Sequence, residues 1–571
     1  MTTAVSVPAM ASDDLWKRCA GCGFMHYTKK LTRCLGVCPE CGYHGRLTAS
    51  ERIDQLVDKG SFVPLPVKAS AADVLGFTDS QPYLTRLTKA RRSTGLDDAV
   101  VCGTAEIGGA PLSLAVMDFR FMGGSLGSVV GELITETAET ALRKRTPFLV
   151  VTASGGARMQ EGVLALMQMA KVSQAVAALR ESGLLTVSVV TDPTYGGVAA
   201  SFATNCDVVV VERGARMGFA GPRVIEQTIM QKLPPDFQTA EFLMAHGQVD
   251  AVQHRQDLRR WLCNLLRATS TTSDSSTRHV RRKAGDVIVR DSAVLEPLDP
   301  WQAVASARDT ARPTTLDYLA TAFDGFVELH GDRTSADCSS IIAGFATLQG
   351  KRIAVVGHQK GHHTKEIVSR NFGMPRPEGY RKALRVMRLA ARLGVPILSI
   401  VDTPGAYPGR DAEEHGQSIA IAESILGMFE LPVPVVTVIT GEGGSGGALA
   451  LAVADRVLMF ERGTYSVISP EGCSAILWGD AKSASAAARA LRITARELLE
   501  LGVVDGVLTE PPSAQVDGGA MSAKLAAAVI ATLAELSEAD GMTLIRERRK
   551  RFRAYGTDGV VLSGMRKEAV N

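Results

Sequence analysis

The sequence predicts an α/β protein with two tandem large domains of one architecture, preceded by a small zinc ribbon. With 571 residues the chain is longer than one hydrophobic core usually supports. Four cysteines near its start have metal-ligand spacing, and its two large parts repeat the same features in the same order. We expect a ribbon over residues 15–45, a first domain over 46–266 and a linker over 267–297. A second domain over 298–540 and a charged tail over 541–571 follow.

Composition places the chain among ordinary globular proteins, with 46% hydrophobic and 22% charged residues. The formal charge of +3 is too mild to require nucleic acid or a membrane as a partner. The N-terminal residues form no basic leader with an apolar core, and no later apolar run approaches the roughly 18 residues of a membrane span. We therefore expect a cytoplasmic protein without membrane association.

The predicted ribbon contains two Cys-x2-Cys knuckles, each followed by glycine. Their four thiols belong to Cys19, Cys22, Cys38 and Cys41. Each knuckle lets two thiolates converge on one tetrahedral ion, and the glycine permits the tight turn. We expect one structural Zn²⁺ per chain. Cys34, His26 and His44 are expected to be bystanders, because four thiolates already close a structural site.

From about residue 100, apolar strand-like segments alternate with helical ones. In the first half, PLSLAVMDF and PFLVVTAS flank the helical segment ELITETAETALRK. This alternation indicates a parallel sheet. The stretch from about 267 to 287 is rich in serine and threonine and lacks apolar periodicity, which indicates an exposed linker.

The two halves repeat. A buried strand ends at LVVTASGGARMQ in one half and at LSIVDTPGAYPG in the other. The next strand runs into DPTYGGVAASFATNCD or GEGGSGGALALAVAD. The interval from Asp207 to Pro222 equals that from Asp455 to Pro470, at fifteen residues. We interpret the chain as a duplication.

A glycine pair follows the corresponding strand in each half: Gly196-Gly197 and Gly446-Gly447. A backbone without Cβ can approach a ligand closely, and the first-turn N–H groups of a helix have no intrahelical acceptor. Such donors stabilise an oxyanion by roughly 3 to 4 kcal/mol each. Close helix–sheet packing explains either pair alone equally well, but its occurrence at the same repeat position in both halves favours function.

Other catalytic signatures are missing near these pairs. Ser201 and Ser445 lack the Gly-x-Ser-x-Gly context of a nucleophile, and the sequence has no P-loop. The chemistry indicated is stabilisation of two oxyanions without a covalent nucleophile or direct use of ATP. Two enolate-like species that react with each other would need this arrangement.

Longer strings resemble the carboxyltransferase of bacterial acetyl-CoA carboxylase, normally separate β and α subunits, here joined in that order. The first half resembles β through CAGCG, CPECG, TASGGARMQEG, PTYGGVAASFA and GFAGPRVIEQT. The second resembles α through TLDY, GHQKG, RNFGMPRPEGYRKALR, DTPGAYPG, GEGGSGGALA and TYSVISPEGCSAILW. The resemblance covers nearly the whole chain. It implies a crotonase-like ββα spiral fold for a β-type domain over 46–266 and an α-type domain over 298–540.

The resemblance also implies a reaction, in which the carboxyl group of N-carboxybiotin passes to acetyl-CoA and gives malonyl-CoA for fatty acid synthesis. Gly446 and Gly447 would stabilise the enolate of acetyl-CoA, and Gly196 and Gly197 the ureido oxyanion of biotin. No side-chain base is then needed, since the biotin nitrogen can take the proton. Further candidates for substrate binding are Lys360, for coenzyme A phosphates, and Gly155, Gly156 and Gly405.

The sequence has no ATP-grasp domain and no Met-Lys-Met biotinylation site. Biotin carboxylase and a biotin carboxyl carrier protein are therefore expected as separate partners. We expect a homodimer equivalent to α2β2, and the sequence leaves open whether a site forms within or between chains. It also leaves open acetyl-CoA against propionyl-CoA, which differ by one methylene. The α subunit of this family usually carries a longer helical segment before TLDY, whereas here the linker reaches TLDY quickly.

Two other functions are alternatives to a carboxyltransferase. A nucleic-acid-binding regulator could use the ribbon and its basic neighbours Lys17, Arg18, Lys29, Lys30, Arg33 and Arg46. It leaves the duplicated glycine-rich halves unexplained. An enoyl-CoA hydratase or isomerase would use a glutamate beside the oxyanion site, and biotin dependence separates it from a carboxyltransferase. The basic run RERRKRFR is expected to be a solvated tail, and Asp192 and Asp402 receive no role.

Overall fold

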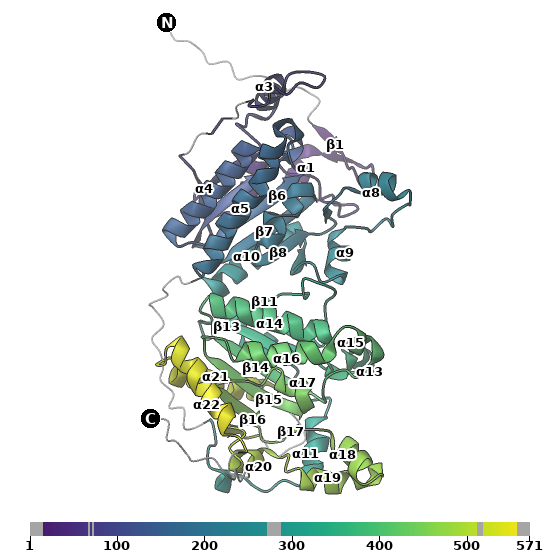
Figure 1. Ribbon diagram of the computed structural model, residues 1–571, viewed down its shortest axis with the longest axis vertical. Coiled ribbons are helices and arrows are strands. Elements are labelled where there is room, and N and C mark those ends of the chain that lie inside the picture. The colour runs from purple at the N-terminus through teal and green to yellow at the C-terminus, as the bar shows by residue number, and fades with distance from the viewer. Residues whose placement is uncertain (1–14, 67–68, 71–72, 271–286, 511–517, 557–571) are drawn as a thin grey trace, which may run out of the picture. The chain divides into compact units, whose positions relative to one another are not determined.

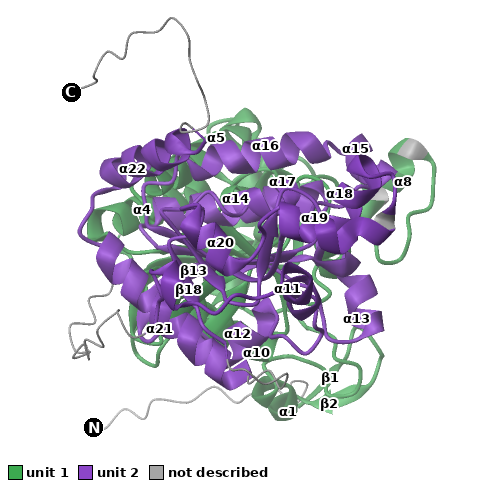
Figure 2. Cartoon of the chain, turned by 90° about the horizontal axis from the view of Figure 1, so that it is seen from below, with its two compact units in different colours: residues 1–277, 325–337, 344–347 green, residues 278–324, 338–343, 348–571 purple. Residues whose placement is uncertain are grey.

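The computed structural model describes residues 15–66, 69–70, 73–270, 287–510 and 518–556 (Figure 1). The chain divides into two compact units (Figure 2). Unit 1 comprises residues 1–277, 325–337 and 344–347, and unit 2 comprises 278–324, 338–343 and 348–571.

Unit 1 begins with the cysteine-bearing segment. Its antiparallel strands β1 (Trp16–Arg18) and β2 (Met25–Tyr27) lead into α1 (Thr28–Arg33). A capping box between Thr48 and Glu51 then starts α2 (Ala49–Leu56) and satisfies two backbone N–H groups. This small module therefore connects to the large sheet through a helix with a defined start.

The sheet of unit 1 has the order β10-β8-β7-β6-β5-β4-β3, with β9 paired to β7. Strands β5, β6, β7, β8 and β10 are parallel, and β3, β4 and β5 are antiparallel. In chain order, the strands are β3 (Val63–Pro64), β4 (Val100–Ile107), β5 (Ala110–Met117), β6 (Phe148–Ser154), β7 (Thr186–Tyr195), β8 (Val208–Glu212), β9 (Met217–Gly218) and β10 (Ala251–Gln253). The helices are α3 (Tyr83–Thr94), α4 (Ser128–Lys144), α5 (Val163–Glu181), α6 (Gly196–Ala199), α7 (Phe202–Asn205), α8 (Pro222–Ile229), α9 (Ala240–Ala245) and α10 (Arg255–Thr269).

The second sheet has the order β11-β12-β13-β14-β15-β16-β18, with β17 paired to β15. Its strands are β11 (Asp324–Glu328), β12 (Ile341–Leu348), β13 (Lys351–His358), β14 (Ile397–Thr403), β15 (Val435–Gly444), β16 (Arg456–Phe460), β17 (Thr464–Ser466) and β18 (Gly506–Leu508). The helices are α11 (Pro300–Ala307), α12 (Thr315–Ala322), α13 (Thr364–Ser369), α14 (Pro377–Arg392), α15 (Arg410–Glu414), α16 (Gln417–Met428), α17 (Ser445–Leu449), α18 (Pro470–Leu477), α19 (Ala484–Ala490), α20 (Ala495–Glu500), α21 (Gly518–Leu536) and α22 (Gly541–Ala554).

The two sheets repeat each other strand by strand, which confirms the predicted α/β duplication. Parallel strands β5-β6-β7-β8-β10 match β13-β14-β15-β16-β18. Asp207 accepts the N–H of the first residue of β7, and Asp455 does the same for β15, at 3.0 and 2.8 Å. Strands buried on both faces explain why the sequence shows continuous apolar runs.

The described structure differs from the predicted boundaries. Residues 325–337 belong to unit 1 because their backbone is bonded there: the His330 N–H donates to Asp250 O at 2.9 Å, and the Arg333 N–H to Gly247 O at 2.8 Å. Of the predicted linker, residues 271–286 lie outside the described residues. Its end is ordered, since Val289 and Val507 exchange backbone hydrogen bonds of 2.9 and 2.8 Å.

The prediction of a solvated tail from residue 541 was wrong for its first part. Residues 541–554 form α22, and the side chain of Arg548 is buried. Arg548 binds both carboxylate oxygens of Asp455, at 3.0 and 2.7 Å. It also donates to three carbonyl oxygens, those of Met428, Leu431 and Val433. The run of charges in the sequence does not show which arginine meets buried acceptors.

The expectation that no apolar run approaches membrane-spanning length was also wrong. By length and composition, the 19-residue helix α21 could cross a membrane. Half of its apolar window is nevertheless buried inside the structure, through residues such as Leu525 and Val529. Ser522 of this helix accepts a hydrogen bond of 2.7 Å from Thr321 of α12. These contacts are typical of a core helix.

Candidate functional site

The predicted zinc ligands converge. The Sγ atoms of Cys19, Cys22, Cys38 and Cys41 all lie within 4.8 Å of one another. The Cys19–Cys41 and Cys22–Cys38 separations are 3.7 and 3.8 Å. A tetrahedral ion with Zn–S bonds of about 2.3 Å places its sulfurs about 3.8 Å apart, so the four thiols fit Zn²⁺. The predicted bystander His26 contacts Cys38, Nε2 to Sγ at 3.2 Å, as an outer-shell group would.

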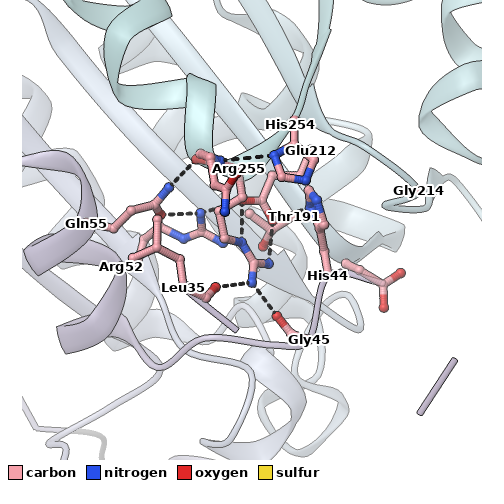
Figure 3. Close-up of polar contacts among 12 residues, drawn as sticks. Leu35, His44, Gly45, Arg52, Gln55, Thr191, Glu212, Gly214, His254 and Arg255 are labelled. Carbon is pink, nitrogen blue, oxygen red and sulfur yellow. Dashed lines mark hydrogen bonds and ion pairs between the residues drawn. The ribbon is translucent and has the colours of Figure 1, made fainter. Parts of the chain in front are cut away.

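A buried arginine anchors the cysteine module to the sheet of unit 1 (Figure 3). Arg255 forms a bidentate pair with Glu212, at 2.9 and 2.7 Å. Its Nη1 donates to the carbonyl oxygens of Leu35 and Gly45, both at 2.8 Å. Arg52 also binds Glu212, at 2.5 Å. The guanidinium of Arg255 thus joins the module to the end of β8.

His44 lies beside this anchor and keeps the role of a bystander. Its side chain is buried, and burial lowers its pKa to about 4, so the ring is neutral near pH 7. Within the described residues neither ring nitrogen has a hydrogen-bond partner. The ring packs edge-on against His254.

Zinc content provides a test of the cysteine cluster. We expect about one zinc per chain by elemental analysis, and loss of that zinc in Cys38→Ser. Removal should also raise amide hydrogen exchange over residues 35–45, because the ribbon backbone loses the cross-link that fixes the acceptors of Arg255. Cys34→Ser is the matched control, since its thiol is outside the cluster. Equal zinc in both variants would argue against the assignment.

Strand pairing shows that the two glycine pairs are offset by one residue, which corrects the predicted equivalence. Ser154 pairs with Thr194 on β7, and Thr403 pairs with Gly443 on β15. Counting onward, Gly197 coincides with Gly446. Gly196 coincides with Ser445, and both take left-handed conformations, with φ of 59° and 56°. The pairs are adjacent in the repeat rather than superimposed.

The backbone N–H groups of the two glycine pairs differ in whether they are already hydrogen-bonded. The Gly196 N–H is occupied, since it donates to Phe219 O at 3.0 Å. The N–H groups of Gly197 and Gly446 open short helices and have no acceptor within the part of the chain that the structure describes. Among the described residues the Gly447 N–H likewise has no acceptor, so Gly197, Gly446 and Gly447 are the members of the pairs whose N–H groups are free to donate to a ligand.

Local packing separates Gly447 from Gly446. A Cβ on Gly447 would lie 2.3 Å from the backbone nitrogen of Ala406, so close packing requires glycine there. A Cβ on Gly446 would meet only Ile421 Cγ2, at 3.9 Å. Its φ is not in the left-handed region. Packing within the chain does not explain glycine at 446, and a backbone without Cβ leaves room for a ligand to approach there.

A second turn lies beside each glycine pair, after β6 and β14. The Gly155 N–H donates to Gly123 O at 2.8 Å. The Gly156 N–H donates to Ser154 Oγ at 3.0 Å, and the Gly405 N–H to Thr403 Oγ1 at 3.1 Å. The three predicted substrate-binding glycines thus shape the turns with their N–H groups already bonded.

The next residue in each of these turns is an alanine that the sequence analysis missed. Among the described residues, the N–H groups of Ala157 and Ala406 have no acceptor. Ala157 N lies 4.0 Å from the Cβ position of Gly196, and Ala406 N lies 2.3 Å from that of Gly447. Each half therefore places a free alanine N–H beside its glycine pair, Ala157 beside Gly196-Gly197 and Ala406 beside Gly446-Gly447. Two converging donors can stabilise one oxyanion.

Lys360 does not lie free at the surface. Its Nζ is 2.7 Å from both Asp402 Oδ1 and Glu442 Oε2. Asp402, which received no role from the sequence, is therefore its partner. A coenzyme A phosphate would have to compete with two carboxylates for this ammonium group, which weighs against the predicted role. Lys382 of α14 is buried and donates to Cys338 O at 2.8 Å.

Comparison with known proteins agrees with this architecture. Residues 250–556 match the family described as acetyl co-enzyme A carboxylase carboxyltransferase-like. Over 95% of its length the chain is 60% identical to the acetyl-coenzyme A carboxylase carboxyl transferase subunits beta/alpha of Salinispora arenicola, covering 96% of that protein. Over 52% of its length it is 56% identical to subunit alpha of Thermus thermophilus, covering 95% of it.

Among solved structures, the transcarboxylase 12S core shares the fold, with a TM-score of 0.66 at 24% identity over 85% of this chain and 90% of that one. The two sheets thus have the crotonase-like fold of that carboxyltransferase core. More narrowly, the chain belongs to the acetyl-CoA carboxylase carboxyltransferase family, with β-type and α-type halves in one polypeptide.

Proposed function

We propose that this enzyme transfers the carboxyl group of N-carboxybiotin to acetyl-CoA and forms malonyl-CoA. The observation that carries the proposal is the paired donor geometry, two free backbone N–H groups at the same place in each half. Biotin would arrive on a separate biotin carboxyl carrier protein after loading by biotin carboxylase. The names of the relatives favour acetyl-CoA over longer acyl groups.

Each half would stabilise one of the two charges of the reaction. On the β-type side, the N–H groups of Gly197 and Ala157 would face the ureido oxygen of biotin, which gains charge as the N–C bond breaks and CO2 leaves. On the α-type side, those of Gly446 and Ala406 would face the thioester oxygen. The biotin nitrogen takes a methyl proton of acetyl-CoA, and the enolate carbon then attacks CO2. The enzyme supplies oriented donors and proximity rather than a base.

The reverse reaction tests this proposal. Purified enzyme receives malonyl-CoA and a free biotin derivative, and formation of acetyl-CoA is measured. We expect turnover that depends on the biotin derivative. Hydration of crotonyl-CoA without biotin would instead support the hydratase alternative. Absence of acetyl-CoA formation by the wild-type enzyme would rule the proposal out.

We also propose a homodimer in which each site combines a β-type half of one chain with an α-type half of the other. Helices α5 and α16 border the two turns: Met169 lies 3.0 Å from the Cβ position of Gly197, and Ile421 lies 3.9 Å from that of Gly446. Both helices expose large apolar side chains, at Val163, Leu166, Met167, Ile419 and Leu426. A second copy would cover these side chains and exclude water from the turns.

A further inference from the structure

A buried ammonium group joins two carboxylates at the ends of three neighbouring strands of unit 2. Lys360 follows β13, Asp402 lies in β14 and Glu442 in β15. These three strands are neighbours in the second sheet (Figure 1). We call these three residues the strand-end cluster. Their side chains are 17%, 11% and 11% exposed. Burial alone would lower the pKa of Lys360, but the carboxylates outweigh it and raise that pKa, so the lysine stays charged.

The cluster lies where β14 and β15 leave regular register. Between Val401 and Thr403 of β14, one residue faces three residues of β15, so backbone groups of this bulge lose their ladder partners. The Glu442 N–H instead donates to Asp402 Oδ1, at 2.8 Å. The same oxygen accepts the bond from Lys360. Lys360 therefore neutralises the carboxylate that holds the bulge in place.

The other half of the duplication builds the same bulge without this cluster. Strand pairing aligns the three residues of the cluster with Phe119, Ala153 and Pro193 of unit 1. Because Pro193 has no N–H, Ala153, which aligns with Asp402, needs no side-chain acceptor. The nearby ion pair of unit 1, Arg46 with Asp192, is 3.9 Å long and partly exposed. The fold itself therefore does not require the charges of unit 2.

We propose that the strand-end cluster positions the two N–H donors of the α-type half. Asp402 precedes Ala406 by four residues, and Glu442 precedes Gly446 by four, so the cluster ties together both segments that carry a donor. Oxyanion donors must be held within about 0.5 Å of the productive geometry. Charge-assisted hydrogen bonds are short and directional, which gives a reason to bury charges where unit 1 has apolar residues. The inference rests on the proposed function.

Lys360→Met in the full chain tests the inference through the reverse reaction. We expect kcat to fall by about tenfold to hundredfold, because displaced donors stabilise the transition state less, while KM for malonyl-CoA changes by less than about threefold. Lys360→Arg should recover part of the lost kcat, since it keeps the charge. Lys365→Met, an exposed position five residues on, is the matched control and should behave as wild type.

The outcomes separate this inference from its alternatives. A raised KM with unchanged kcat would overturn it and assign Lys360 to substrate binding. A folded Lys360→Met enzyme with kcat within twofold of wild type would also overturn it. If Lys360→Met does not fold, the double variant Lys360→Met/Asp402→Asn removes the cation and one of its two partner charges, while Glu442 keeps its ion pair with Arg308, and the same kinetic criteria apply. Inactivity of the wild-type enzyme would contradict the proposed function before any variant is compared.

Discussion

Gly446→Val is expected to lower kcat of the reverse reaction by about 10²- to 10³-fold while the chain remains folded. An added Cβ meets only Ile421, at 3.9 Å, and the backbone conformation of residue 446 is not left-handed, so we expect the fold to tolerate a side chain here. This side chain would occupy the space in front of the free N–H, where the thioester oxygen must approach. Gly446→Ala should give a smaller loss of about tenfold. Steady-state kinetics and thermal unfolding of the same preparations measure both effects.

A control variant separates lost catalysis from lost structure. Gly518→Val places the same side chain at the first residue of α21, where an added Cβ meets only Pro313, at 3.5 Å. It should retain wild-type kcat. If Gly446→Val folds and keeps half of the wild-type kcat or more, the N–H of residue 446 does not face the reaction.

Arg548→Met is expected to destabilise unit 2 by about 3 to 5 kcal/mol. The guanidinium is 1% exposed and makes five hydrogen bonds, two of them to Asp455. Its removal leaves a buried carboxylate and three carbonyl groups without their donor, and Asp455 itself holds the start of β15. The strand that leads to Gly446 is therefore affected as well.

Arg553→Met makes the same change at an exposed position of the same helix and should shift stability by less than about 0.5 kcal/mol. Denaturant unfolding followed by circular dichroism compares the two variants. Equal stability of Arg548→Met and Arg553→Met would show that α22 is not part of the cooperative core of unit 2.

The fold was predictable because the duplication is visible twice in the sequence, once in the apolar strands and once in the polar residues that hydrogen-bond the backbone. Asp207 and Asp455 occupy equivalent places and each accepts the first N–H of a strand. The predicted equivalence of the two glycine pairs was wrong by one position. The chain takes ten residues from Gly197 to Asp207 and nine from Gly446 to Asp455, so alignment on the letters alone matches the wrong members.

The candidate site was only partly predictable because all of its proposed donors are backbone N–H groups, and half of these belong to alanines, which have no side-chain signature. Ala157 and Ala406 supply N–H groups, and an alanine in a sequence does not indicate that role. The partners of Lys360 could not be predicted from the sequence for another reason. Asp402 and Glu442 lie 42 and 82 residues further along the chain and meet the lysine only when β13, β14 and β15 pair.

The most direct test of the account mixes two inactive enzymes. Gly197→Val and Gly446→Val are prepared separately with two different tags and are then mixed under conditions in which dimers exchange subunits. Purification through both tags confirms that hybrid dimers have formed. If each site joins the β-type half of one chain to the α-type half of the other, half of the dimers are hybrids with one intact site each. The mixture should then recover about a quarter of the wild-type reverse activity. No recovery in confirmed hybrids would contradict the claim.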